Sequence, residues 1–119
     1  MTILTRDQIL SANDQTTETV EVPEWGGSVI VSTMSGRERD AFESSLMADK
    51  GSSKSANMAN LRARLASLCC VAEDGTRMFT QADIEALGNK SAAALNRIFL
   101  AAQRLNGIGE DAVEELAGN

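Results

Sequence analysis

The sequence predicts a single α+β domain, residues 1–119, that is mainly α-helical and carries an N-terminal β-hairpin. Threonine- and valine-rich segments flank a Pro-Glu-Trp-Gly-Gly turn within residues 16–33, which is typical of two paired strands. From residue 35 onward, apolar side chains recur at the spacing of a helix face. Aromatic residues make up only 3% of the chain, so we expect an aliphatic core.

A short helix is expected before the hairpin. Thr5 and Gln8 have the spacing of a capping box, in which each side chain accepts a hydrogen bond from the other residue's backbone N–H. The helix extends to about Ala12. The first strand of the hairpin follows over residues 16–22, where threonine and valine predominate.

The turn of the hairpin contains the only proline and the only tryptophan of the chain. Pro23 ends the first strand because it has no N–H to donate to a sheet. The glycines at 26–27 permit a tight reversal, and residues 28–33 form the returning strand. Trp25 therefore lies at the tip, where it either covers the apolar face of the hairpin or stays exposed as an anchor for a partner.

Ser35 and Glu38 form a second capping box, which opens a helix with Phe42 and Leu46 on its apolar stripe. Residues 48–56 are rich in Gly, Ser and Lys and lack any apolar period, so they predict a mobile loop. The next helix carries an apolar stripe with steps of three and four. Because this stripe spans only two heptads, it indicates a core-facing helix rather than a coiled coil; it consists of Met58, Leu61, Leu65, Leu68 and Ala72.

Three further helices are expected after a turn at 73–76. Thr80 caps a short helix with Ile84 and Leu87 inward, which Gly88 closes. The longest helix begins at Ser91 and ends at 106–107. Its apolar face comprises Leu95, Ile98, Phe99, Ala102 and Leu105. A last, acidic helix is expected over Glu110–Ala117, and its only large apolar side chains are Val113 and Leu116.

The charge distribution argues against nucleic acid as a partner. The chain carries a net charge of −6, whereas phosphate binding needs a basic face. Residues 37–64 are net basic and lie between two net acidic segments. This alternation fits either a mixed solvated surface or charge-driven association between copies.

No catalytic constellation is evident. The chain has no histidine, and its acidic pairs lie at helix starts or turns, where carboxylates stabilise the helix dipole. Cys69 and Cys70 are adjacent and match neither a disulfide framework nor a common zinc pattern, so we expect two reduced, apolar thiols. These features predict no enzyme activity, no cofactor and no metal site.

No apolar run is long enough for a membrane span, and the N-terminus is not typical of a signal peptide, so we expect a cytoplasmic protein that does not contact a membrane. Together these observations describe a small acidic interaction module.

Three stretches resemble the tail assembly chaperones of long-tailed bacteriophages. They are VPEWGGSVIVSTMSGRERDAFESSL (22–46), NLRARLASLCCVAEDGTRMFTQADIEALGNKSAAALNRIF (60–99) and AAQRLNGIGEDAVEELAGN (101–119). The order and spacing of these features carry the resemblance, which extends from about residue 16 to the end. The chain departs from the family by ending in Ala-Gly-Asn rather than in a basic residue followed by Asn.

The resemblance implies a non-catalytic role in the cytoplasm of the host cell. Such chaperones bind the tape measure protein, keep it soluble, and leave as tail tube proteins polymerise, so the protein is not expected in the mature virion. The resemblance also implies a short form, a longer form made by ribosomal frameshifting that contacts the tail tube protein, and a homo-oligomer. The alternative is a small structural virion protein, such as a tail tube or connector component.

Four residues are candidates for partner binding. Trp25 is one, because tryptophan is enriched at the centre of protein interfaces. The others belong to the C-terminal segment, whose sparse apolar stripe predicts weak docking that a partner could use. They are Ile108, Val113 and Leu116.

Overall fold

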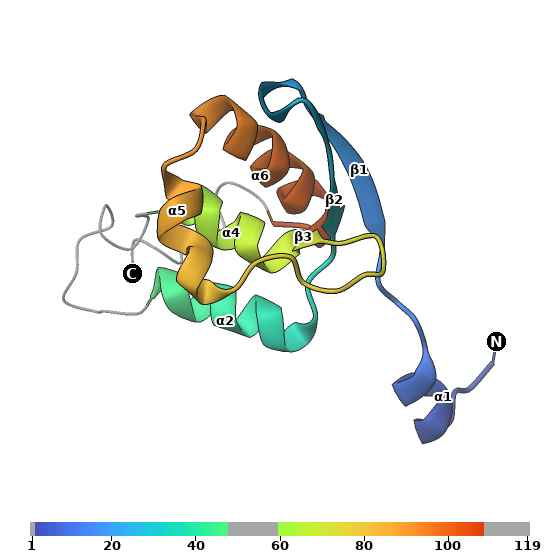
Figure 1. Ribbon diagram of the computed structural model, residues 1–119. Helices are drawn as coiled ribbons and strands as arrows, with labels where there is room; N and C mark the ends of the chain where they lie inside the picture. Colours follow the sequence, from blue (N-terminus) through green and yellow to red (C-terminus); the bar gives the residue numbers. More distant parts are fainter. Residues whose placement is uncertain (1, 48–59, 109–119) are drawn as a thin grey trace.

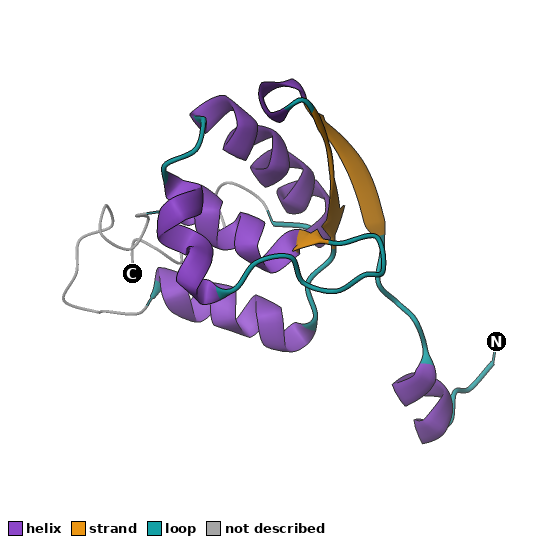
Figure 2. Ribbon diagram, in the orientation of Figure 1, coloured by secondary structure: helices purple, strands orange, loops and turns teal. Residues whose placement is uncertain are grey.

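The computed structural model describes residues 2–47 and 60–108. Within these ranges, helices pack against a three-stranded antiparallel sheet (Figure 1). Figure 2 shows that helices predominate and that the strands lie along one edge of the body. The predicted mainly helical α+β fold with an N-terminal hairpin is confirmed.

The hairpin has the predicted strands and turn. Strand β1 (Thr17–Val22) pairs with β2 (Gly27–Ser32) in a register that runs from Thr17 opposite Ser32 to Val22 opposite Gly27. The connection is a 3₁₀ turn, η1 (Pro23–Trp25), followed by Gly26 with φ +73°. Glycine suits this position because a left-handed backbone conformation strains residues that carry a Cβ.

A third strand, β3 (Cys70–Val71), was not predicted. It pairs with β2 at Ile30 and Val31, so β2 is the central strand. The prediction of a helix through Ala72 was therefore wrong, because α4 (Leu61–Cys69) ends at Cys69. Pairing with a distant strand overrides the local helical spacing at this point.

Helix α4 lies at the centre of the helical layer. It contacts α6 (Ala92–Asn106), α5 (Ile84–Gly88) and α2 (Gly36–Leu46), and α6 in turn covers β1 and β2 (Figure 1). The buried core contains residues from β2, α2, α4, β3 and α6 together with Ile108, namely Val31, Phe42, Leu46, Leu61, Leu65, Ala66, Cys69, Cys70, Ile98, Phe99, Ala101, Ala102 and Ile108.

Local capping signals confirm several predicted helix starts. Ser35 and Thr80 each form a capping box, and the Ser91 hydroxyl accepts a hydrogen bond from the Ala94 N–H. Thr80 opens a 3₁₀ turn, η2 (Gln81–Asp83), which continues directly into α5. Leu87 is buried as expected, whereas Ile84 is only half-buried and Gly88 is the last residue of α5 rather than its C-cap.

Asn106 joins the ends of several elements. Its Oδ1 accepts a hydrogen bond from the Met34 backbone N–H at 2.7 Å, and its Nδ2 donates to the Ala102 carbonyl at 2.9 Å. Its backbone carbonyl accepts a hydrogen bond from the Arg39 guanidinium at 2.9 Å. The connection between β2 and α2 is thereby fixed to the end of α6.

Residues 2–14, which we call the N-terminal arm, extend from the body (Figure 1). The arm contains α1 (Arg6–Ser11), whose predicted capping box of Thr5 and Gln8 is confirmed and which has no buried residue. The body begins at Gln15, whose Nε2 donates to Ser32 Oγ at 2.8 Å. The arm is thus attached to the sheet at its C-terminal end.

Some predicted features lie outside the described residues. These are the loop at 48–56, the first position of the stripe at Met58 and the helix over Glu110–Ala117.

We predict that Leu65→Ala lowers the free energy of unfolding by about 2–5 kcal/mol, because Leu65 is fully buried and its truncation leaves a cavity. The matched control is Leu100→Ala on α6, where the side chain is 48% exposed and the loss should stay below about 1 kcal/mol. Urea unfolding followed by circular dichroism measures both. Equal losses for the two variants would contradict the assignment of the core.

Candidate functional site

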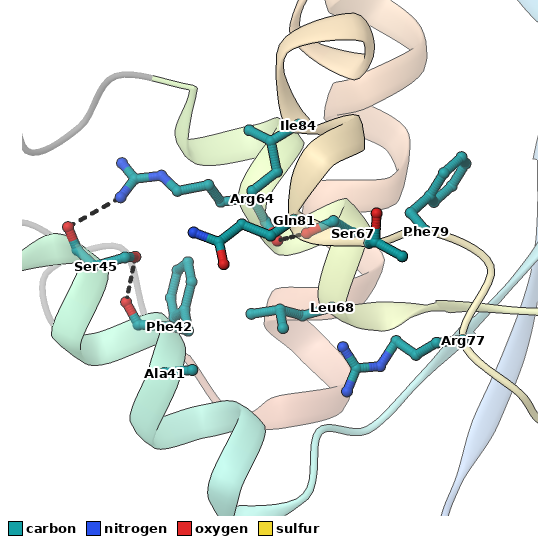
Figure 3. A pocket seen from close by; sticks show the side chains of 11 residues that line it. Ala41, Phe42, Ser45, Arg64, Ser67, Leu68, Arg77, Phe79, Gln81 and Ile84 are labelled. Carbon is teal, nitrogen blue, oxygen red and sulfur yellow. Dashed lines mark hydrogen bonds between the residues drawn. The ribbon is translucent and has the colours of Figure 1, made fainter.

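A groove of about 320 Å³ lies between α2, α4 and residues 77–84 (Figure 3). We call it the α2–α4 groove. Phe42 from α2 and Leu68 from α4 form its apolar base, and Phe79 and Ile84 lie on the side of the 77–84 segment. The remaining lining residues are Ala41, Ser45, Arg64, Ser67, Arg77, Thr80 and Gln81.

Two arginines give the α2–α4 groove a basic rim. Arg64 donates from its guanidinium to the Ser45 carbonyl at 3.0 Å, and Arg77 pairs with Glu38 of α2. Burial lowers the pKa of both arginines, yet guanidinium groups remain protonated at neutral pH. In Figure 3 the two arginines lie on opposite sides of Phe42 and Leu68. Since Arg77 is already paired with Glu38, the groove is best suited to accept apolar side chains.

A second surface combines the hairpin tip with α6, and we call it the hairpin–α6 surface. Arg97 pairs with Glu24 beside Trp25, with its Nε 3.0 Å from Glu24 Oε1, and this hydrogen bond lowers the pKa of Glu24. Arg104 pairs with Glu18 of β1. Leu100 lies between the two arginines along α6 and is 48% exposed.

The structure places the four predicted partner-binding residues differently. Trp25 lies at the hairpin tip and is 38% exposed, so part of its ring is open to a partner. Ile108 is only 6% exposed and belongs to the core, where its N–H donates to the Gln103 carbonyl at the end of α6. Val113 and Leu116 lie outside the described residues. Of the two candidates within the described residues, only Trp25 is therefore accessible to a partner.

The predictions missed the α2–α4 groove and Leu100. The groove is assembled from α2, α4 and the 77–84 segment, and no single stretch of sequence indicates it. The exposure of Leu100 could have been predicted from the sequence, because it is a large apolar residue outside the predicted apolar face of its helix.

Within the described residues, no group of three or more His, Cys, Asp or Glu side chains could hold a metal ion. The same part of the chain contains no helix long and apolar enough to cross a membrane. Cys69 and Cys70 are buried and unpaired with each other. Burial raises the pKa of Cys69 to about 12 and that of Cys70 to about 11, so neither thiol is activated as a nucleophile at neutral pH.

The chain matches a family model in sequence and a solved structure in fold. The sequence model of a family described as phage tail assembly chaperone matches residues 5–117. Among solved structures, the chain is similar to the bacteriophage HK97 tail assembly chaperone, with a TM-score of 0.61, 20% identity, and coverage of 87% of this chain and 95% of that one. At this identity the structural match shows a shared fold. No curated protein matches the sequence.

The buried thiols lead to a prediction about alkaline pH. Their stabilising contribution is complete below pH 9.0, the ordinary pKa, and is lost as the pH rises to about 11 for Cys70 and about 12 for Cys69, because the unfolded chain there releases protons that the folded chain retains. The free energy of unfolding should therefore fall less steeply over this range in a Cys69→Ala, Cys70→Ala variant. Urea unfolding of both proteins at several pH values measures the slopes. Parallel slopes would show that the thiols are not protected by folding.

Proposed function

The chain belongs to the phage tail assembly chaperone family, and from this premise we propose that it binds the tape measure protein during tail assembly. It keeps that very long and largely helical chain soluble and is released as the tail tube forms. Its role is to bind and release, without catalysis. It acts in the host cell cytoplasm and does not remain in the mature virion.

The observation that carries this proposal is the hairpin–α6 surface. Trp25 and Leu100 are large apolar side chains that remain 38% and 48% exposed on the folded body. Aromatic and aliphatic anchors of this kind supply much of the binding energy in protein interfaces. Two anchors on an open surface suit a contact that must form along a helical partner and later dissociate.

The ion pairs of this surface supply specificity around the two anchors. Glu24 with Arg97 and Glu18 with Arg104 hold the hairpin against α6, so Trp25 and Leu100 keep a fixed relation in the free protein. Charged groups at the edge of an interface affect association rate and partner choice more than affinity. A helix that presents apolar residues to Trp25 and Leu100 can align its own charges with these pairs.

The C-terminal segment would extend the contact. Val113 and Leu116 remain candidates for partner binding there. A longer form made by frameshifting would continue from this end and recruit the tail tube protein. Ile108 anchors the start of the segment in the core, so its role is to position the residues beyond it rather than to meet the partner.

We predict that Leu100→Asp and Trp25→Ala each weaken binding of a tape measure fragment by at least about tenfold, since each removes an apolar anchor. Met78→Asp is the matched control, because Met78 is similarly exposed at 47% but lies outside the hairpin–α6 surface. Co-expression, pull-down and calorimetry with each variant measure solubility and affinity. Circular dichroism checks that all three variants fold.

Two outcomes would contradict the proposal. Unchanged affinity in both test variants would place the tape measure contact elsewhere. Mass spectrometry of purified particles tests release, and a stoichiometric amount of this chain in mature virions would favour the alternative role as a structural component of the tail.

A further inference from the structure

The N-terminal arm exposes a large apolar surface for a segment of its size. Its four large apolar side chains are between 57% and 80% exposed, and none of the described residues covers them. They are Ile3, Leu4, Ile9 and Leu10. Burial of apolar side chains of this size is favourable, so the arm has a tendency to dock.

The shape of the arm is set by its own sequence. The capping box of Thr5 and Gln8 fixes the start of α1, and Leu4 and Ile9 occupy the two positions of a hydrophobic staple around it. A six-residue helix is nevertheless marginal in water without tertiary contacts. The arm therefore has the features of a docking element whose helix an acceptor would stabilise.

The arm leaves the body in a direction that keeps it away from the α2–α4 groove of its own chain. Gln15 and Thr16 are held against β2 and its following residue, by hydrogen bonds to Ser32 and Thr33. From this attachment, α1 extends outward beyond the end of the sheet (Figure 1). An acceptor on another molecule is thus the more accessible one.

The α2–α4 groove has the chemistry that such an acceptor needs. Its base is formed by apolar side chains, and at its edge Glu38 of α2 balances the charge of Arg77. The match that the arm offers is apolar, because Asp7 is paired with Arg6 whereas Ile9 and Leu10 are exposed. A volume of about 320 Å³ can accept two or three aliphatic side chains of a helix, such as Ile9 and Leu10.

We propose that the N-terminal arm of one copy docks in the α2–α4 groove of a second copy, with Ile9 and Leu10 against the partly exposed Leu68 and Phe79. The arm and the groove are different surfaces, so the contact is heterologous and each added copy presents a free arm or a free groove. The hairpin–α6 surface takes no part in this contact. The inference therefore stands independently of tape measure binding.

Complementation between two defective variants tests this arrangement. The arm variant carries Ile9→Asp and Leu10→Asp, and the groove variant carries Gln81→Trp, which fills the groove from an exposed position on η2. Each variant alone should associate at least about tenfold more weakly than the wild type. Mixed together they should form a one-to-one dimer, because the groove variant keeps its arm and the arm variant keeps its groove.

Light scattering after size-exclusion chromatography measures the molar mass of each variant and of the mixture. Leu100→Asp is a matched control that should associate like the wild type. The wild-type complex should persist in 1 M salt, because its contact is mainly apolar. Four results would each overturn the proposal. They are a wild type that stays monomeric at high concentration, normal association of the arm variant alone, failure of the two variants to pair when mixed, and loss of the wild-type complex in 1 M salt.

Cysteine cross-linking gives a second measurement that does not depend on weakening the contact. A Leu10→Cys chain mixed with a Gln81→Cys chain should form a disulfide-linked dimer under mild oxidation, because the two positions meet in the docked arrangement. The natural Cys69 and Cys70 are buried and should not interfere. Equal cross-linking of Leu10→Cys with a Leu100→Cys chain would overturn the arrangement.

Discussion

The burial of α4 is the constraint around which the rest of the structure is arranged. Six of its nine residues are buried, and α2, α5, α6 and β2 all contact it. Ala63, Ala66 and Ser67 are small, so neighbouring elements can approach the helix closely on more than one side. A two-stranded hairpin is marginally stable alone, and here α6, β3 and α4 together provide the surface against which it packs.

This central position of α4 leaves the two candidate binding surfaces at the periphery. The α2–α4 groove exists because α2 and residues 77–84 cover α4 incompletely, so that Ser67 and Leu68 reach its base. The hairpin–α6 surface exists because α6 buries one face on the sheet and turns Leu100 outward. An assembly protein organised in this way can bind and release partners at its surface while its core remains intact.

The sequence predicts what is encoded locally and misses what distant segments create. Three helix or turn starts are confirmed, and each depends on a capping box between residues that are only three positions apart. These starts are at Thr5, Ser35 and Thr80. Strand β3 was missed because Cys70 and Val71 continue a helical pattern and leave it only by pairing with β2. Nearly the whole circumference of α4 is buried, so the apolar stripe predicted from the sequence contained too few of the residues that α4 contributes to the core.

The same distinction applies to the candidate site. Trp25 was placed correctly at the hairpin tip, because proline and glycine determine the turn locally. Ile108 was expected in a detachable segment, yet the left-handed Gly107 that ends α6 directs it into the core. The α2–α4 groove and the position of Leu100 between two ion pairs depend on tertiary packing, which residue spacing alone does not determine.

The central claim is that the folded body binds a helical tail protein at its surface without rearrangement of α4. Hydrogen–deuterium exchange of the chain, alone and with a tape measure fragment, tests it most directly. The account predicts increased protection at the hairpin tip, residues 23–27, and in α6 around Leu100, with the exchange of α4 amides unchanged. Protection confined to other elements, or faster exchange throughout α4 on binding, would contradict it.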